Sequence, residues 1–409
     1  MDLFEDALDA GTITENPYAP PPLVRRTMAE LEAIPFNGLH FVGSFSGCGG
    51  SSLGLRSAGW HPLAAVEFVP AAAATYQANF PHTRIYETDI RELDPETILA
   101  DLGLRSGELD LFEGSPPCAS FSAAGSREKG WGKVKSYSGT KQATDDLFWE
   151  WKRVLAGLMP KAFIAENVPG LAMGSALEEY AWKISSELSE LGYSIDASVL
   201  NSAAYGVPQA RRRLIFIGFR NDRGISASTV FERIRARALL VPNTLRQALE
   251  SVDPNDPDHA PYLADSSIEG SAIARARDVR LGDRTLGDCA FCRTSFDAHL
   301  KDGSGTAVCA NGEKAIEVKD YFMLTIPELD KPVPTITATA AQRHSASVIH
   351  PVEARKFTPA EAKALSGFPA DFRLTGSRED RIERIGRTVT PPLYEACGIE
   401  IAKALRGDG

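Results

Sequence analysis

The sequence predicts an α/β protein built on a doubly wound, mostly parallel sheet, and two observations support this class. Short apolar segments alternate with helical segments from residue 39 to 219, and this alternation produces βαβ units. Turns whose residues suit ligand binding or catalysis directly follow several of the apolar segments. Examples are the glycine-rich turn at 46–50 and the proline pair at 116–117. Ligands of such sheets bind at the carboxyl ends of the strands. We therefore expect a binding site where these turns converge.

The elements can be placed in order along the chain. A peripheral extension with several prolines and a short helical stretch near 23–34 precedes the alternation. A proline in the first turn favours the helix at 70–80, and a glycine ends the helix at 52–59. The expected helices are 52–59, 70–80, 145–158 and 176–191. The expected strands are 39–45, 62–68, 83–90, 109–117 and 162–168, followed by a hairpin-like pair at 194–207 and 211–219.

Composition sets the broad class of protein. The chain has 409 residues, 43% of them hydrophobic, which is enough for a large core and two domains. No apolar run reaches the roughly 20 residues of a membrane span, and the first residues are acidic, so we expect a soluble cytoplasmic protein without a membrane partner. Six cysteines do not indicate a disulfide framework. The net charge of -10 argues against a basic nucleic-acid coat protein but allows a positive cleft.

The segment Ser44–Leu55 is the first candidate binding site. Gly47 and Gly50 lie between a strand and a helix, where glycine lets a ligand approach the backbone and the helix N-terminus offers free N–H groups. An ordinary tight turn is the alternative. Glu67 ends the next strand, where an acid can bind ribose hydroxyls, and Asp89 ends the third, where it could accept a hydrogen bond from an adenine amino group. This series favours an adenosine-containing cofactor.

Three reactive groups follow on later turns. Cys118 comes after the stiff pair 116–117, Glu166 ends an apolar strand, and Arg211 and Arg213 alternate at the start of another. Each has a plainer interpretation: a structural cysteine, a surface or capping carboxylate, and a solvated strand entrance. A nucleophile, an acid and a cationic clamp together are what attack on a pyrimidine ring requires.

The ordered motifs FSGCGG, PPC, ENV, QxRxR, PTIT, RKFTPAEAKALSGFP and GRTV resemble those of the DNA cytosine-5 methyltransferases, over most of residues 39–409. The resemblance implies a Rossmann-like S-adenosylmethionine-dependent methyltransferase domain with a smaller target-recognition domain. It implies S-adenosylmethionine as donor and double-stranded DNA as substrate. It assigns catalysis to Cys118, Glu166, Arg211 and Arg213, with no metal. The positions matching the family's cofactor site are Phe45, Gly47, Gly50, Glu67, Phe68, Asp89, Ile90, Pro117, Arg387, Thr388 and Val389.

The resemblance also predicts the domain organisation and the mechanism. We expect an N-terminal extension, a catalytic cofactor-binding domain, a target-recognition domain and a C-terminal segment that returns to the catalytic domain, in a monomer. Their respective ranges are 1–36, 37–221, 222–379 and 380–409. In the implied mechanism the target cytosine is flipped out of the duplex. Cys118 adds to C6, Glu166 protonates or hydrogen-bonds N3, Arg213 binds O2 and orients Glu166, and Arg211 supports the catalytic loop or the adduct.

Several positions depart from the family. Gly43 replaces the acid two places before the motif phenylalanine, so one cofactor contact is missing, and Ala119 replaces a glutamine after the nucleophile. Arg387 stands where the family has Asn, and such a cation near the donor sulfonium needs an anion. Either Glu383 or Asp380 supplies it in a local salt bridge, or the donor does. In the second case the donor is carboxy-S-adenosylmethionine and the product 5-carboxymethylcytosine.

Three further alternatives stay open. Cys289 and Cys292, with His299 and Cys309 downstream, are either a zinc site of unusual spacing or ordinary reduced cysteines. A DNA-binding homologue without activity would have lost reactive groups, and all of them are present. An RNA cytosine-5 methyltransferase is disfavoured by the long variable region between residues 221 and 330.

Overall fold

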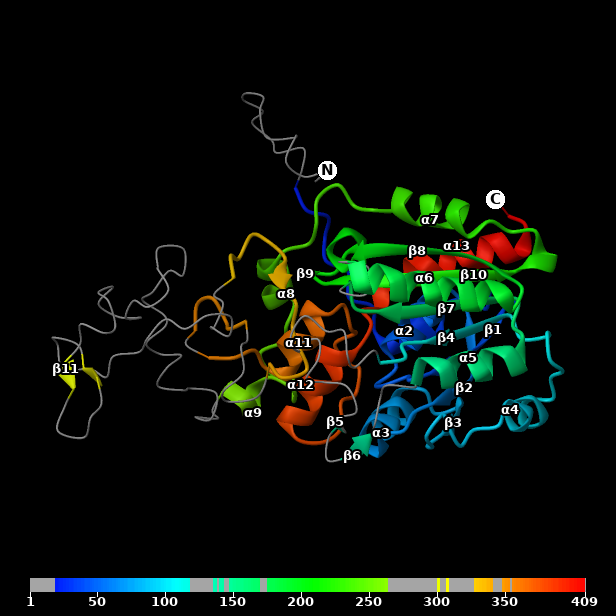
Figure 1. Cartoon of the computed structure of the whole chain (residues 1–409). Coiled ribbons are helices and arrows are strands. Elements are labelled where there is room, and N and C mark those ends of the chain that lie inside the picture. Colours follow the sequence, from blue (N-terminus) through cyan, green and yellow to red (C-terminus); the bar gives the residue numbers. More distant parts are fainter. Residues whose placement is uncertain are drawn as a thin grey trace, which may run out of the picture.

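The computed structural model describes residues 19–117, 135–137, 140–142, 147–169, 175–263, 300–301, 307–308, 327–340, 348–353 and 355–408. A seven-stranded sheet in the order β3-β2-β1-β4-β7-β10-β8 forms the centre of this part. Figure 1 shows the sheet on the right and a group of short helices, α8, α9, α11 and α12, beside it on the left.

The sheet confirms the predicted fold class. Its strands are β1 (His40–Ser44), β2 (His61–Val66), β3 (Arg84–Tyr86), β4 (Leu111–Gly114), β7 (Ala162–Asn167), β8 (Tyr193–Asn201) and β10 (Arg212–Arg220). The neighbouring strands from β3 to β7 are parallel. β10 runs antiparallel to both β7 and β8, so the hairpin-like pair is also confirmed. The strand order reverses between β1 and β4, which is where doubly wound sheets bind ligands.

Helices cover both faces of the sheet. The helices of the main body are α2 (Gly50–Ser57), α3 (Pro70–Asn79), α4 (Pro95–Leu102), α5 (Leu147–Leu158), α6 (Ser175–Glu190), α7 (Ala227–Ala236) and α13 (Pro391–Arg406). α4, α5 and α6 share a core with the sheet face that carries Val42 and Phe112. α2, α7 and α13 share one with the opposite face, which carries Phe41 and Leu111. Adjacent strand residues thus enter different cores, as the two-residue period of a strand requires.

The remaining elements lie around this body. They are α1 (Met28–Glu32), α8 (Leu245–Glu250), α9 (Ala260–Leu263), α11 (Pro359–Leu365), α12 (Arg378–Arg387) and the strands β5 (Lys135–Tyr137), β6 (Thr140–Gln142), β9 (Gln209–Ala210), β11 (Leu300–Lys301), β12 (Ala307–Val308) and β13 (Val333–Pro334). β13 pairs in parallel with β9.

Six of the seven predicted strands end earlier than predicted, and β1 and β4 do so for clear local reasons. β1 ends at Ser44 because Phe45 has a φ of 51°, which a strand cannot accommodate. β4 ends at Gly114, shortly before the prolines at 116 and 117, which lack the N–H that a ladder needs. Both ends open into the turns on which the candidate site depends.

The C-terminal helices pack closely on the sheet-bearing body. The indole of Trp60 donates to the carbonyl of Gly398 in α13 at 2.9 Å. A Cβ atom on Gly54 of α2 would lie 2.4 Å from the carbonyl of Pro391, so only glycine permits this approach. Phe368 shares a core with Leu53, and α7 joins the α13 core. The body around the sheet therefore extends past residue 221 and resumes before residue 380.

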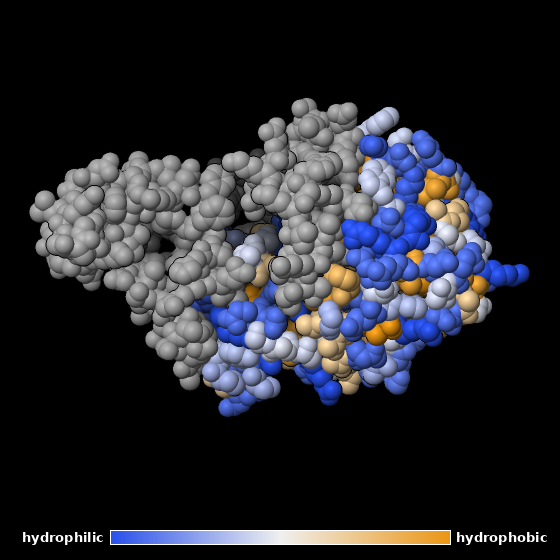
Figure 2. All heavy atoms as spheres, turned by 60° about the horizontal axis from the view of Figure 1, so that its bottom comes forward, coloured by the Kyte–Doolittle hydropathy of each residue, from blue (hydrophilic) through white to orange (hydrophobic). Residues whose placement is uncertain are grey.

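The described surface is mainly polar in one view. Figure 2 shows a face on which hydrophilic residues predominate and apolar residues are scattered. Among the described residues, no helix combines the length and apolar character needed to cross a bilayer.

Candidate active site

A cavity of about 560 Å³ lies at the carboxyl ends of the strands. Its size falls within the usual range for small-molecule and cofactor sites. The predicted residues that line it are Phe45, Gly47, Glu67, Phe68, Ile90, Pro117, Glu166, Arg211, Arg213, Arg387, Thr388 and Val389. The predicted nucleophile, Cys118, lies outside the described residues, directly after Pro117.

Gly50 and Asp89 are absent from the described lining of this cavity. A Cβ atom on Gly50 would lie 2.0 Å from Thr388 Oγ1, so this glycine permits close packing of α2 on the 388–389 segment. Asp89 accepts a hydrogen bond from the backbone N–H of Arg91 and forms a 2.9 Å ion pair with its guanidinium. The neighbours of Asp89, Thr88 and Ile90, line the cavity instead.

The glycine-rich loop has a strained and firmly held backbone. Phe45, Gly47 and Gly49 have φ angles of 51°, 54° and 93°, and a bulky residue such as Phe adopts this region only under constraint. The carboxylate of Glu67 accepts from the N–H of Gly47 at 2.7 Å and from that of Val69 at 2.8 Å. Burial raises the pKa of Glu67, and these two hydrogen bonds oppose the rise. Glu67 thus holds the loop against the turn after β2.

Glu166 and Arg213, the predicted reactive pair, form an ion pair in the cavity. Glu166 Oε1 lies 2.6 Å from Arg213 Nε, and the side chains are only 11% and 14% exposed. Arg213 also donates to the carbonyl of Arg212 at 2.7 Å. The amide of Asn167, the next residue after Glu166, donates to the carbonyl of Pro116 at 3.1 Å. The acid's strand end is therefore tied directly to the turn that precedes Cys118.

Arg211 has a supporting position. Its guanidinium is buried and donates to the carbonyls of Ile336 and Gly386, at 3.3 and 3.1 Å. Burial, with a smaller contribution from the charge of Arg213, lowers the pKa of Arg211 to about 9, so it remains cationic at neutral pH. Gln209 also binds this segment, because its side-chain amide oxygen accepts from the backbone N–H of Ile336 at 3.1 Å. These contacts join three distant segments around the cavity.

Arg387 lines the cavity and pairs with Glu383 one helical turn earlier. Its Nε and a terminal guanidinium nitrogen each lie 2.8 Å from Glu383 Oε1. The Arg387 side chain is still 43% exposed. The geometry matches the local salt bridge, the first of the two expectations for this residue.

Sequence reasoning missed a buried carboxyl beside the glycine-rich loop. Glu113 is 1% exposed and lies within strand β4, so its position suggested only core packing. Its carboxyl accepts from the hydroxyl of Ser51 at 2.8 Å, and Ser51 lines the cavity together with Ser46. An acid inside an otherwise apolar strand was the available signal.

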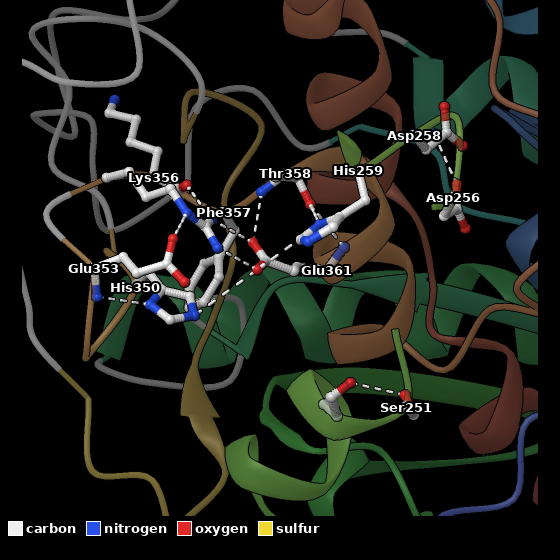
Figure 3. A network of polar contacts seen from close by, with 12 residues as sticks. Ser251, Asp256, Asp258, His259, His350, Glu353, Lys356, Phe357, Thr358 and Glu361 are labelled. Carbon is white, nitrogen blue, oxygen red and sulfur yellow. Dashed lines mark hydrogen bonds and ion pairs between the residues drawn. The ribbon is translucent and has the colours of Figure 1, made fainter. Parts of the chain in front are cut away.

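A second buried polar cluster lies at the N-terminus of α11 (Figure 3). Arg355 binds both oxygens of Glu361, at 2.6 and 2.7 Å, and the N–H of Thr358 donates to the same carboxylate at 2.8 Å. His259 and His350 lie 4.0 and 3.8 Å from Glu361. We call these residues the α11 cluster. All of its members lie within the range 222–379 predicted for the target-recognition domain, and they join residues about 100 positions apart in the sequence.

The described ranges contain no group of three or more His, Cys, Asp or Glu side chains arranged to hold a metal ion. Cys289, Cys292, His299 and Cys309 lie outside these ranges, so the zinc question remains a sequence-based prediction.

The fold and cavity define a nucleotide-cofactor-binding α/β enzyme, and comparison with known proteins gives its family. A model of the C-5 cytosine-specific DNA methylases matches residues 39–403. The chain belongs to this family and is a DNA cytosine-5 methyltransferase. It is 29% identical to the type II methyltransferase M1.HphI of Haemophilus parahaemolyticus, over 89% of this chain and 87% of the relative. It is 27% identical to M.DdeI of Desulfomicrobium norvegicum, over 89% and 88%.

Solved structures share the fold. A DNA modification methyltransferase encoded within a prophage, from E. coli, aligns with a TM-score of 0.59 at 23% identity, covering 90% of this chain and 100% of that one. A Spodoptera frugiperda DNMT2 mutant aligns with a TM-score of 0.56 at 18% identity, covering 90% and 100%. The family implies S-adenosylmethionine as the cofactor.

Proposed function

We propose that the protein transfers a methyl group from S-adenosylmethionine to C5 of a cytosine flipped out of double-stranded DNA. The observation that carries the proposal is the Glu166–Arg213 ion pair, 2.6 Å long, in the same cavity as the glycine-rich loop and Pro117. In support, Asn167, which follows the acid, donates to the carbonyl of Pro116, two residues before Cys118 in the sequence. By analogy with its type II relatives, the enzyme would act in restriction-modification. The monomeric state is part of our proposal and rests on the sequence-based expectation alone.

The cavity residues fit the cofactor. The Ser46 hydroxyl is buried and has no hydrogen-bond partner within the described part of the chain, although it lines the cavity. Such a group indicates a missing polar ligand. Gly47 leaves its surroundings open, since a Cβ atom there would meet no described atom within 4 Å. The loop and Glu67 would hold the adenosine and amino-acid portions, and the bound cofactor would supply an electrophilic methyl group.

The chemistry then follows from the chain's own residues. The Cys118 thiolate forms a bond to C6, and the electron pair of the C5–C6 double bond is displaced toward N3 and O2. Glu166 donates a proton or hydrogen bond to N3, and Arg213 stabilises the charge that develops at O2. C5 becomes nucleophilic and takes the methyl group. Loss of the C5 proton and elimination of Cys118 restore the aromatic ring.

Covalent trapping tests this mechanism. Duplex DNA with 5-fluorocytosine at the target should form a stable adduct with Cys118, because the fluorine cannot leave as a proton does. Cys118→Ser should abolish both the adduct and turnover, while cofactor and DNA binding persist. The rival thiol is Cys48, which lines the cavity, but burial raises its pKa to about 11 and leaves it protonated. The Cys48→Ala variant should therefore still form the covalent adduct with the 5-fluorocytosine duplex. An adduct mapped to Cys48 would refute the assignment.

Carboxymethyl transfer is the second candidate, because Arg387 faces the cavity with a partly exposed guanidinium. Carboxy-S-adenosylmethionine would have to compete with Glu383 for that group. Each donor should be offered separately and the product nucleosides weighed by mass spectrometry. Efficient methylation without a carboxymethyl product refutes this candidate. A carboxymethyl preference that Arg387→Asn reverses would establish it, with Glu383→Gln as the matched variant that removes the competing carboxylate.

The polymer substrate needs its own test, because an RNA cytosine-5 methyltransferase shares the chemistry. Labelled duplex DNA and transfer RNA should be compared as competing substrates. We expect methyl incorporation into DNA alone, and incorporation into RNA would reverse the proposal.

A further inference from the structure

Glu113 occupies the space that a side chain at position 43 would need. Gly43 of β1 and Glu113 of β4 are direct partners in the parallel register. A Cβ atom on Gly43 would lie 2.7 Å from Glu113 Oε1 and 2.9 Å from Ser46 Oγ. The absence of a side chain on β1 is thus what makes room for the carboxyl from β4.

The surroundings of Glu113 are polar, and the described residues supply no compensating cation. Its Oε1 accepts from Ser51 at 2.8 Å, and no ion pair to it forms among the described residues. Among the described residues, the titratable groups that interact electrostatically with it are Glu166 of β7, Tyr76 of α3 and Tyr394 of α13, none of which is cationic. Isolated charge is costly in such a place, so the carboxyl needs either a proton or a cationic ligand.

The route from Glu113 to the cavity is short. Ser46 and Ser51 both line the cavity, Ser51 binds the carboxyl, and the Ser46 hydroxyl has no described partner. The donor carries positive charge on its sulfonium and its amino group. The Glu113 carboxylate lies behind these two serines, outside the described lining of the cavity, and would attract that positive charge.

We propose that Glu113 is the counter-charge for the ammonium group of the donor, supplied from β4 in place of the acid that Gly43 lacks. Glu113 acts through Ser46 and Ser51, so it is a positioning residue. The inference rests on the proposed binding of S-adenosylmethionine in this cavity.

The proposal predicts a specific pH dependence of cofactor binding. Burial raises the pKa of Glu113 to about 8, with Glu166 adding to the rise and the Ser51 hydrogen bond opposing it. The free protein therefore holds the proton at neutral pH. A bound cation favours the carboxylate, so binding releases a proton and becomes up to about tenfold tighter per pH unit as the pH rises toward 8.

Titration calorimetry with S-adenosylmethionine at pH 6.5, 7.5 and 8.5, in buffers of different ionisation enthalpy, tests this prediction. Wild type should release about half a proton at pH 7.5, the release that a tenfold affinity difference implies, and should bind more tightly there than at pH 6.5. Glu113→Gln should release fewer protons and bind about tenfold more weakly at pH 8.5, while the two proteins converge at pH 6.5. Equal affinities and proton release at every pH would refute the role of Glu113. A wild type that binds no S-adenosylmethionine would instead refute the proposed function.

A reciprocal exchange sharpens the test. Glu113→Ala removes the carboxyl, and Gly43→Asp alone should clash with Glu113 and place two like charges together. The double variant Gly43→Asp/Glu113→Ala should recover cofactor affinity to within about threefold of wild type at pH 8.5. The matched control Gly43→Ala/Glu113→Ala should not. If the folded double variant, checked by its melting temperature, binds no better than this control, position 43 and Glu113 do not exchange roles.

Discussion

Glu113 and Glu361 are equally buried carboxyls in two regions of the molecule, at 1% and 2% exposure, but their partners differ. Glu361, in the α11 cluster, receives two charged hydrogen bonds from Arg355 and one backbone N–H. Glu113, beside the cavity, receives one hydroxyl hydrogen bond from Ser51. Burial alone therefore does not reveal what a carboxyl does. A fully compensated carboxyl stabilises the fold, whereas an undercompensated one next to a cavity indicates a ligand.

The largest expected effect is the loss of a partner in the α11 cluster. Arg355→Met would leave Glu361 buried without its cation, which should lower the free energy of unfolding by about 3–5 kcal/mol. Urea unfolding followed by circular dichroism measures it. The exposed pair Arg246–Asp330, 2.7 Å apart, provides the control, and Arg246→Gln should leave the midpoint almost unchanged. Equal midpoints for the two variants would remove the distinction between the regions.

The reactive pair should show the opposite pattern, in which the rate changes more than stability. Glu166→Gln should lower kcat about 10²–10³-fold, because the group acts on charge that develops in the ring. Arg213→Met should have a similar effect, and the double variant should lose less than the product of the two factors. Single-turnover methylation of duplex DNA measures the rates, and DNA affinity should change little. Fully multiplicative losses would mean that the two residues act independently.

The last expected effect concerns the stability of the cofactor-free protein and its change with pH. The native state holds the proton of Glu113 up to about pH 8, whereas the unfolded chain releases it near 4.5. Stability should therefore fall as the pH rises between these values, by at most about 1.4 kcal/mol per unit from this group. Glu113→Gln should remove that slope. Its advantage in melting temperature over wild type should grow from pH 5.5 to 8 and then level off.

This stability measurement separates a functional group from a structural one. A Glu113 that merely supports the fold would make Glu113→Gln less stable at every pH. If Glu113 serves the cofactor, Glu113→Gln should instead be more stable than wild type at high pH and yet bind the cofactor more weakly than wild type.

Local patterns were enough to predict the sheet and most of the cavity lining. The order of strands and helices follows from periodicity and from turn residues within a few positions of each other, so bounds such as 145–158 for α5 were close to the observed Leu147–Leu158. The pairing of Arg387 with Glu383 was also predictable, because residues four apart meet on a helix face. The role of Asp89 was harder to predict. Only the folded structure shows that Asp89 pairs with Arg91 and that its neighbours, not Asp89 itself, line the cavity.

By itself, the sequence determined the fold class and the family, and it predicted the groups proposed for cytosine-5 chemistry, because these depend on motifs and short-range periodicity. Only the tertiary structure decided which distant residues share a site. Gly43 and Glu113 meet through the register of two parallel strands, and His259, His350 and Glu361 meet at the start of one helix. Such neighbours depend on how strands and helices pack across long sequence separations, and no local pattern records that packing. The environment of each carboxyl, and therefore its charge, is a property of the folded chain.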